Sequence, residues 1–398
     1  MALVLLWSLS GTGAIGAGPP PEQTRVIVLG VDHSAQLVSR AYRAAVMEAF
    51  FDRVKPDAIC VERDPENFAT GDFYEFTYEV SDIAVPYVRD RRLGLCPFDW
   101  MPSKNDQVLG FGLDMDAPPP VRPAAGFQGF LTFPDKAALR RGLFWAEDRS
   151  ALTDWDAFAD RAAKGATPEM SRRLFLYRTM LQARRIGQAA RAWRGKTLLV
   201  VVGAYHERDI ETFLAADPGI VLVTAQGVGE PDADTAARFD RPRYLLASLS
   251  FNLLGRQAAT GNIDLGWMAE MLDRLEADGP TPETSLLRLR LRRLSGDADA
   301  AATLAAYRTL WSATPADAGF TWTGVKDHSR LDSFFDPFGN LTVRQRIRLE
   351  MAREMVALGR TGDTVVLRRE LAAMLNPAQA AQLHAYWPLL GEAPARNQ

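Results

Sequence analysis

The sequence predicts an α/β fold: a parallel-sheet core with a helical insertion between strands 3 and 4, followed by a helical C-terminal region. The first observation behind this prediction is a motif that occurs twice, at residues 25–33 (RVIVLGVDH) and 197–206 (TLLVVVGAYH). The second is the alternation of short β-branched runs with helical stretches between residues 25 and 230. The third is that residues 231–398 show helical periodicity only.

Each copy of the motif is an apolar run, a glycine, two further residues and a histidine. A short apolar run that stops at glycine is typical of a buried strand in a parallel sheet. The glycine permits a sharp turn, so the histidine follows the carboxyl end of the strand, where open α/β sheets bind ligands. We therefore predict that His33 and His206 meet in one site. The alternative is two loop histidines that follow neighbouring strands without a shared role.

Composition and charge narrow the class of protein. A chain of 398 residues with 47% hydrophobic and 24% charged residues is typical of a globular protein with a sizeable core. The net charge of −3 offers no overall positive field, so we predict no nucleic-acid partner. No later stretch is long and apolar enough to span a bilayer, so no transmembrane helix is expected.

Cysteine usage excludes a disulfide scaffold, because the chain contains only Cys60 and Cys96. Both lie within apolar runs, which predicts buried thiols. The two could form a disulfide only if their strands are adjacent and correctly aimed.

Residues 1–24 form a candidate signal or leader. An apolar stretch at 2–7 and small residues at 14–17 precede three prolines, but the usual positive charge near the start is missing. With a cleaved signal the protein would be extracytoplasmic, that is periplasmic or secreted; with an unstructured lead it would be cytoplasmic. The G-x-G-x-x-G pattern at 11–16 is followed by prolines rather than a helix, so it predicts no dinucleotide site.

The first half of the core reads as strand, helix, strand. After His33, residues 35–53 have helical periodicity with Ser34 as their cap, and residues 57–62 form a second buried strand. Glu62 ends this strand and reaches the same sheet edge as His33. Its carboxylate could cap the next helix, but the neighbouring histidine favours a role in the site.

The third strand and its surroundings follow. Residues 63–92 are polar with many aromatics and are expected to form loop and helix over the site. Residues 92–100 contain the third strand, which ends at Asp99, and Pro97 favours an edge position or a bulge. Proline and glycine in residues 101–133 predict a linker or long loop.

The helical insertion covers about residues 134–194. Its clearest helix is expected to begin at Thr167 and to run to Arg194, before Gly195. Arg178 lies beside the expected inward stripe, which consists of Met170, Leu174, Tyr177 and Leu181. A short helix at 208–215 and a strand at 219–224 complete a core of residues 25–230.

Residues 231–398 are predicted to form a separate helical C-terminal region. Leucines and aromatics recur at helical spacing around residues 287–311, and the pattern continues at 342–358 and 364–375. The cluster Lys326-Asp327-His328 lies in a loop-like stretch and is expected at the surface.

Two histidines and a carboxylate at one edge admit several kinds of site. They could hold a divalent metal that activates water, or one histidine could act as a general base oriented by the carboxylate. They could also bind haem or iron without turnover. The sequence contains no G-x-S-x-G elbow, which argues against a serine nucleophile.

Three segments together resemble a known family: GVDH at 30–33, KPDAICVE at 55–62 and GAYH at 203–206. They are similar to the TraB/PrgY/GumN and Tiki proteins, whose wider superfamily includes erythromycin esterases and the haem-binding ChaN lipoproteins. This family carries a pair of G-x-x-H motifs and a Glu at the end of the second strand. It also carries an Arg, usually followed by Asn or Asp, on the helix before the second motif. Arg178 stands at that place, followed by Thr179, which departs from the pattern.

The resemblance implies a hydrolase-like fold but leaves the reaction open. Tiki proteins are read as metal-dependent proteases, the esterases activate water with His and Glu, and ChaN binds haem. We therefore expect a metal-dependent hydrolase of the TraB/Tiki type that acts on a peptide or small-molecule substrate and cleaves a peptide or ester bond with activated water.

The same resemblance implies roles for the site residues. His33, Glu62 and His206 would act on water or hold a divalent metal (Mn, Co or Zn), and Arg178 would stabilise negative charge on the substrate. Asp99 is a reserve ligand. The alternatives are a non-catalytic haem-, metal- or peptide-binding protein, and a scaffold whose helical region docks partners.

Overall fold

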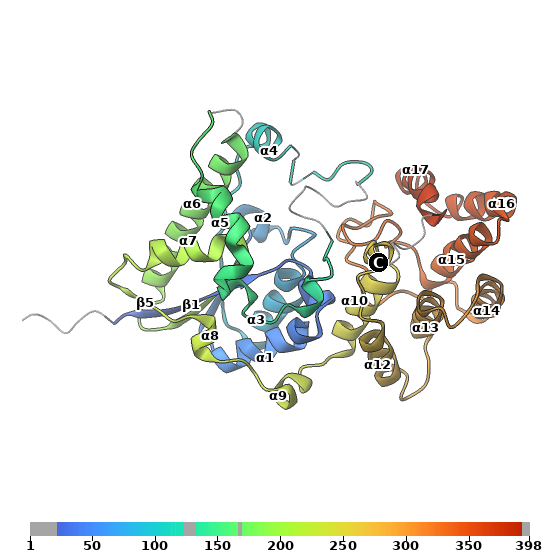
Figure 1. Cartoon of the computed structure of the whole chain (residues 1–398), viewed down its shortest axis with the longest axis horizontal. Helices are drawn as coiled ribbons and strands as arrows, with labels where there is room; N and C mark the ends of the chain where they lie inside the picture. The colour runs from blue at the N-terminus through green and yellow to red at the C-terminus, as the bar shows by residue number, and fades with distance from the viewer. Residues whose placement is uncertain (1–21, 113, 116, 123–132, 166–168, 392–398) are drawn as a thin grey trace, which may run out of the picture.

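The computed structural model describes residues 22–112, 114–115, 117–122, 133–165 and 169–391 (Figure 1). Its core is a five-stranded, all-parallel sheet in the order β3-β2-β4-β1-β5. The strands are β1 (Thr24–Val31), β2 (Ala58–Val61), β3 (Gly94–Pro97), β4 (Thr197–Gly203) and β5 (Ile220–Leu222). The predicted α/β class with a parallel sheet is confirmed.

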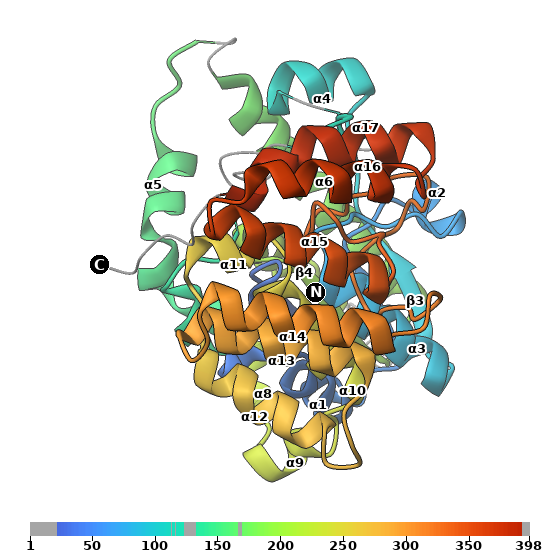
Figure 2. The ribbon, with the colours of Figure 1, turned by 90° about the vertical axis from the view of Figure 1, so that its right-hand side faces the viewer.

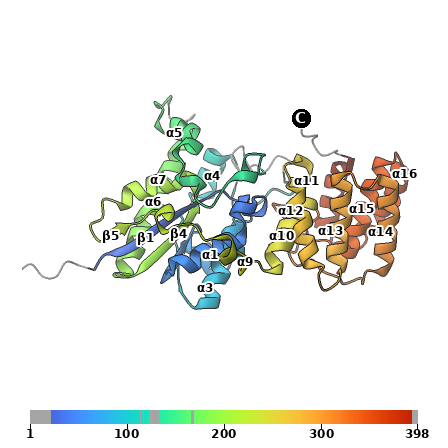
Figure 3. The same ribbon diagram turned by 60° about the horizontal axis from the view of Figure 1, so that its bottom comes forward.

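The two strands of the repeated motif lie side by side at the centre of the sheet. β1 and β4 pair in parallel register from Arg25 opposite Thr197 to Val31 opposite Gly203. Their residues are almost all buried, because helices cover both faces of the sheet. Figure 3 shows these strands between the two layers of helices. Both motifs therefore end at the same edge, as predicted.

β3 lies at the edge of the sheet, where Pro97 costs the fewest ladder hydrogen bonds. Cys60 of β2 stands directly opposite Cys96 of β3, with Cα atoms 4.3 Å apart, and the two form a disulfide. The prediction of two buried thiols is wrong, because the condition for pairing, adjacent strands, is met. The disulfide joins the two strands that lead to Glu62 and Asp99.

The segment after His33 differs from the predicted helix at 35–53. Ser34 adopts a left-handed conformation with φ 70°, and its side chain makes no cap hydrogen bond. Two 3₁₀ turns, Ala35–Leu37 and Arg40–Tyr42, precede helix α1 (Ala44–Val54). The chain turns away from the sheet edge at Ser34, so a regular helix starts only at Ala44.

Residues 63–112 form four short helical elements, three before β3 and one after it. They are α2 (Pro65–Ala69), a π-helical turn (Glu79–Ala84), α3 (Val85–Arg91) and α4 (Lys104–Phe111). Helix α4 lies in the stretch expected to be a linker. It was missed because it buries little apolar surface: Val108 and Leu109 are about half exposed.

The insertion before β4 contains 3₁₀ turns at Ala138–Arg140, Trp145–Glu147 and Arg149–Leu152, then α5 (Thr153–Asp160) and α6 (Met170–Ala192). The predicted start of α6 at Thr167 lies outside the described residues. The predicted inward stripe is wrong, because Tyr177 is 48% exposed. The buried face carries polar Thr179 and Gln182, which face the site rather than an apolar core. Counting apolar residues in the sequence therefore predicts the wrong buried face for α6.

Helix α7 (Ala204–Leu214) begins immediately after β4, four residues before its predicted start at Arg208. Since strand and helix meet without a loop, His206 lies in the first turn of this helix. The short helix α8 (Ala225–Val228) then follows β5.

The helical C-terminal region stacks beside the core (Figures 1 and 2). Its helices are α9 (Ala233–Ala237), α10 (Pro242–Leu253), α11 (Gln257–Thr260), α12 (Leu265–Leu275), α13 (Pro282–Ser295), α14 (Ala300–Ala313), α15 (Val343–Ala357), α16 (Thr361–Ala372) and α17 (Pro377–Tyr386), followed by a 3₁₀ turn at Trp387–Gly391. A segment without helix joins α14 to α15. Phe334 and Phe335 of this segment pack into the core around the sheet.

Two surface predictions can be compared with the structure. His328 and its neighbours Lys326 and Asp327 are exposed, as expected. Within the described part of the chain, no helix is long and apolar enough to cross a bilayer.

Candidate functional site

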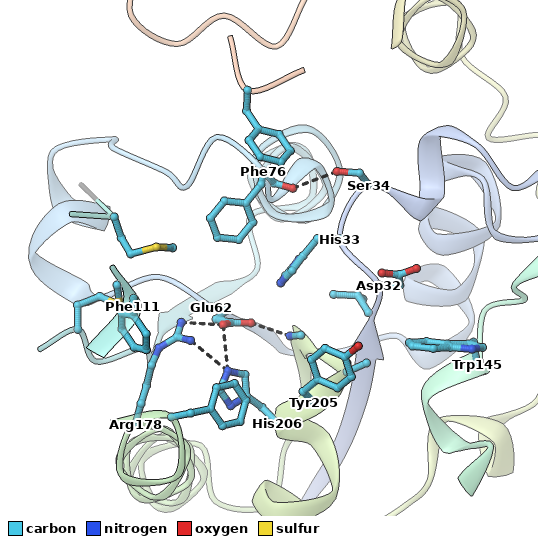
Figure 4. Close-up of a pocket in the computed structure, with 17 residues that line it drawn as sticks. Asp32, His33, Ser34, Glu62, Phe76, Phe111, Trp145, Arg178, Tyr205 and His206 are labelled. Carbon is cyan, nitrogen blue, oxygen red and sulfur yellow. Dashed lines mark hydrogen bonds and ion pairs between the residues drawn. The ribbon is translucent and has the colours of Figure 1, made fainter. Parts of the chain in front are cut away.

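A pocket of about 120 Å³ opens at the carboxyl edge of the sheet, and the predicted residues line it (Figure 4). His33 follows β1, Glu62 follows β2, and His206 follows β4; these three strands are neighbours in the order β2-β4-β1. Arg178 reaches the same pocket from α6. The remaining lining is mostly apolar: Val31, Phe76, Met101, Phe111, Met115, Trp145, Phe175, Ala204 and Phe334, with Asp32, Ser34, Gly203 and Tyr205.

His33 is the more accessible histidine and is held by a buried carboxylate. Its Nδ1 lies 2.8 Å from Oε1 of Glu79, whose side chain is 1% exposed, whereas the side chain of His33 is 18% exposed. Burial lowers the pKa of His33, but Glu79 and Glu62 outweigh it, so the pKa lies above the ordinary value. Because Nδ1–H donates to Glu79, the other nitrogen of the neutral ring, Nε2, carries a lone pair that can accept a proton.

Sequence analysis missed Glu79. It lies in the aromatic stretch expected to cover the site, and it begins the π-helical turn that follows Tyr78. Such turns occur often at functional sites. The only signal in the sequence was a lone carboxylate between Tyr78 and Val80, both apolar neighbours that the structure buries.

His206 is buried and fully engaged. Thr179 donates its hydroxyl proton to the carbonyl of Phe175, so its Oγ1 accepts from Nδ1–H of His206 at 2.6 Å. The other ring nitrogen, Nε2, lies 3.1 Å from Nη1 of Arg178. Burial, Arg178 and His33 together hold the pKa of His206 well below its ordinary value. His206 is therefore a neutral imidazole with both nitrogens occupied.

Arg178 occupies the centre of the site. Its Nε and Nη2 donate to the two oxygens of Asp99 at 2.8 and 2.6 Å, and Nη2 also donates to Glu62 at 2.8 Å. Gln182 and Tyr74 donate to the same Asp99 carboxylate. Burial alone would raise the pKa of Asp99, but Arg178 and these donors lower it. Asp99 thus anchors the arginine and is not placed as a reserve metal ligand.

Glu62, which follows β2, contacts the second G-x-x-H motif at the end of β4. Its Oε2 accepts the backbone N–H of Gly203 at 2.6 Å, and its Oε1 lies 3.6 Å from Nε2 of His206. Burial raises the pKa of Glu62, and Arg178 opposes this rise. A Cβ atom at Gly203 would lie 3.0 Å from Nε2 of His33, so only glycine leaves the site undisturbed.

The first motif has a matching carboxylate, Glu207, which sequence analysis did not select. Its Oε1 accepts the backbone N–H of Gly30 at 2.9 Å. Gly30 of β1 lies beyond the end of the neighbouring strand β5, which pairs with β1 only as far as Val26. In the same way, Gly203 of β4 lies beyond the end of β2, which pairs with β4 only as far as Val201. Each glycine N–H, left without a strand partner, is satisfied by a carboxylate.

Glu207 predicts a measurable pH dependence. Burial, with Glu211 and Glu147 nearby, raises its pKa to about 8. The folded protein therefore keeps a proton that the unfolded chain loses near its ordinary pKa of 4.5, so the free energy of unfolding falls as pH rises from about 4.5 to 8. Glu207→Gln keeps a hydrogen-bond acceptor but removes this titration.

We expect Glu207→Gln to change the free energy of unfolding little at about pH 5. At about pH 9 it should raise that free energy by on the order of 2–4 kcal/mol. Urea unfolding at the two pH values measures the difference, and the exposed Glu230→Gln is the control. An equal effect of Glu207→Gln at both pH values would contradict the assignment.

The three residues proposed as metal ligands do not fit a metal as they are arranged. The guanidinium of Arg178 donates to Glu62 and approaches Nε2 of His206, so a divalent cation would have to displace it and stand beside its charge. Among the described residues, no group of three His, Cys, Asp or Glu is placed to hold a metal. The haem alternative stays a prediction.

The pocket can supply a base and a positive environment for developing negative charge. Helix α7 begins at its wall without a side-chain cap, so first-turn N–H groups there have no intrahelical partner. A guanidinium carries five N–H donors, and the four contacts of Arg178 leave one on Nη1. The arrangement suits attack of water on a carbonyl group.

Comparison of the chain with protein-family models, curated proteins and solved structures finds no match.

Proposed function

We propose that this protein is a hydrolase that uses water activated by His33 to cleave an ester or peptide bond. The observation that supports it is the position of the His33 ring. It is held by buried Glu79, and it borders the same pocket as Arg178 and the uncapped start of α7. A histidine paired with a carboxylate is a common general base. This proposal keeps the hydrolase expected from the resemblance but without its metal, and it assigns the role of general base to His33 alone.

In the proposed reaction, Nε2 of His33 takes a proton from water as the water oxygen bonds to the substrate carbonyl carbon. Nδ1–H stays on Glu79, which stabilises the imidazolium ion that forms. The negative carbonyl oxygen is stabilised by the first-turn N–H groups of α7 and by Nη1 of Arg178. The C–O or C–N bond then breaks, and the leaving group receives the proton from His33.

The other site residues have supporting roles in this scheme. Glu62 and Asp99 hold Arg178 in place, and Thr179 fixes the ring orientation of His206. The aromatic lining, which includes Phe76 and Phe175, favours a substrate with an apolar group beside the bond that is cleaved.

The location of the protein is part of the proposal. Disulfides persist in oxidising compartments and are rare in the cytosol. The Cys60–Cys96 disulfide therefore favours the extracytoplasmic alternative over the cytoplasmic one. Residues 1–21, which would carry the export signal, lie outside the described residues.

The experiment is an assay of the purified full chain against p-nitrophenyl esters of increasing acyl length and against fluorogenic peptides. Each substrate is tested with a chelator and with added Mn²⁺, Co²⁺ or Zn²⁺. We expect hydrolysis that the chelator leaves unchanged, because no proposed step uses a metal. Activity that appears only with added metal would contradict this mechanism and support a metal-dependent hydrolase. Binding of an apolar ester without turnover would favour a receptor.

A further inference from the structure

A buried polar cluster lies behind His33, on the Glu79 side of its ring. We define it by three buried residues, Gln36, Tyr42 and Glu79, each at most 1% exposed. Four of their polar atoms have no hydrogen-bond partner within the described residues: Nε2 and Oε1 of Gln36, Oη of Tyr42 and Oε2 of Glu79. Only Oε1 of Glu79 is occupied, by His33.

The three side chains influence one another although they come from different elements. Gln36 and Tyr42 lie on the two 3₁₀ turns after β1, and Glu79 begins the π-helical turn. Burial raises the pKa of the Tyr42 hydroxyl well above its ordinary value, and Glu79 raises it further. The side-chain amide of Gln36, which approaches the hydroxyl without meeting hydrogen-bond geometry, lowers it. The titratable groups that face the cluster are Glu79 itself, His33 beside it and Glu207 from α7.

Four buried polar atoms without partners would be costly. Each such group has given up its hydrogen bonds to solvent and gains none in return. Native proteins avoid this cost by placing internal water where several polar groups converge, and a buried water makes about three hydrogen bonds. The cluster offers that set: carboxylate and amide oxygens that accept, an amide that donates, and a hydroxyl that does both.

We propose that Gln36, Tyr42 and Glu79 form a site for internal water that holds Glu79 in position for His33. The water donates to Oε2 of Glu79 and bonds to Tyr42 and Gln36. Glu79 is then held on both oxygens, by His33 on one and by water on the other. This role of Gln36 and Tyr42 as positioning residues rests on the proposed function, whereas the water site itself does not.

The first test is a high-resolution crystal structure of the whole chain and of Tyr42→Phe. We expect an ordered water within hydrogen-bond distance of Oε2 of Glu79 and of Oη of Tyr42, and its loss or displacement in Tyr42→Phe. Direct hydrogen bonds among the three side chains without water, or a cation in place of the water, would overturn the proposal.

The second test follows the Nδ1 proton of His33 by NMR, which is practical because the chain contains four histidines. Its resonance is assigned by its loss in His33→Gln. Tyr42→Phe should shift it, because Glu79 loses a partner. The control is Tyr307→Phe. The Tyr307 hydroxyl is also buried and has no hydrogen-bond partner among the described residues, but it belongs to the C-terminal region. Equal spectra for wild type and Tyr42→Phe would contradict the link to His33.

The third readout separates this inference from the proposed function. If the protein hydrolyses an ester, Tyr42→Phe should lower kcat by about three- to tenfold with little change in KM, the effect of one weakened hydrogen bond. If Tyr42→Phe lowers kcat/KM by raising KM rather than by lowering kcat, a positioning role is contradicted. If no substrate is turned over but the water and the NMR shift are found, the water site stands and the hydrolase proposal fails.

Discussion

His33→Gln is expected to lower kcat by about 10²–10⁴-fold on the best ester or peptide substrate, the usual contribution of a general base. KM should change little, because the aromatic lining that binds the substrate is untouched. Glutamine keeps a similar size but cannot take the proton from water. The steady-state rates of the two proteins, measured with the same substrate, check this result.

The matched control is His328→Gln, which removes an exposed histidine from the C-terminal region and should leave kcat unchanged. Thermal unfolding of each variant shows whether the fold is retained. If His33→Gln folds and keeps wild-type kcat, His33 is not the base, and the proposed mechanism is wrong.

The same base predicts the direction of the pH profile. His33 must lose its proton to act, so kcat/KM should rise with pH. The midpoint should lie above 6.5, because the carboxylates of Glu79 and Glu62 raise the pKa of His33 against the effect of burial. Glu79→Gln removes one of these carboxylates, so its midpoint should move to lower pH. A profile that falls across this range, or an unchanged midpoint in Glu79→Gln, would contradict the pairing.

Arg178→Met is expected to lower the free energy of unfolding by about 3–5 kcal/mol at neutral pH, because it leaves the buried carboxylates of Asp99 and Glu62 without their cation. Methionine replaces most of the side-chain volume but none of the charge. Urea unfolding at neutral pH measures the loss. Arg184→Met, on the exposed face of the same helix, is the control and should cost far less.

The pH dependence of this loss identifies its cause. In wild type, Arg178 helps to hold the pKa of Asp99 below its ordinary value. In the variant only the hydrogen bonds from Gln182 and Tyr74 still oppose burial, so the pKa of Asp99 rises. The folded variant then binds protons more tightly than the unfolded chain, so its stability should recover as pH falls. The difference between Arg178→Met and wild type should therefore shrink in acid. A constant difference would point to lost packing instead.

Much of the fold could be predicted because buried parallel strands are short apolar runs that are recognisable in one sequence. Residues 25–31 and 197–203 follow this pattern. Once those strands are parallel, His33, Glu62 and His206 must converge, since residues that follow parallel strands share one edge. Pro97 indicated an edge position or a bulge for β3 by the same local reasoning, and the structure has the edge position.

The contacts of the converging residues could not be predicted, because they depend on segments far apart in the chain. Glu79 reaches His33 only through the π-helical turn, and Thr179 reaches His206 only because α6 buries a polar face. The disulfide depends on β3 lying beside β2, which the order of the strands in the sequence does not reveal.

The sequence alone determined which residues gather at one edge of the sheet: two histidines, a glutamate and an arginine. The tertiary structure alone decided which charges they meet there. Two histidines and a carboxylate look the same in a sequence whether a metal or an arginine stands among them. The placement of Arg178 between Glu62 and His206 makes the difference, because a metal cation would have to displace this guanidinium and stand beside its charge.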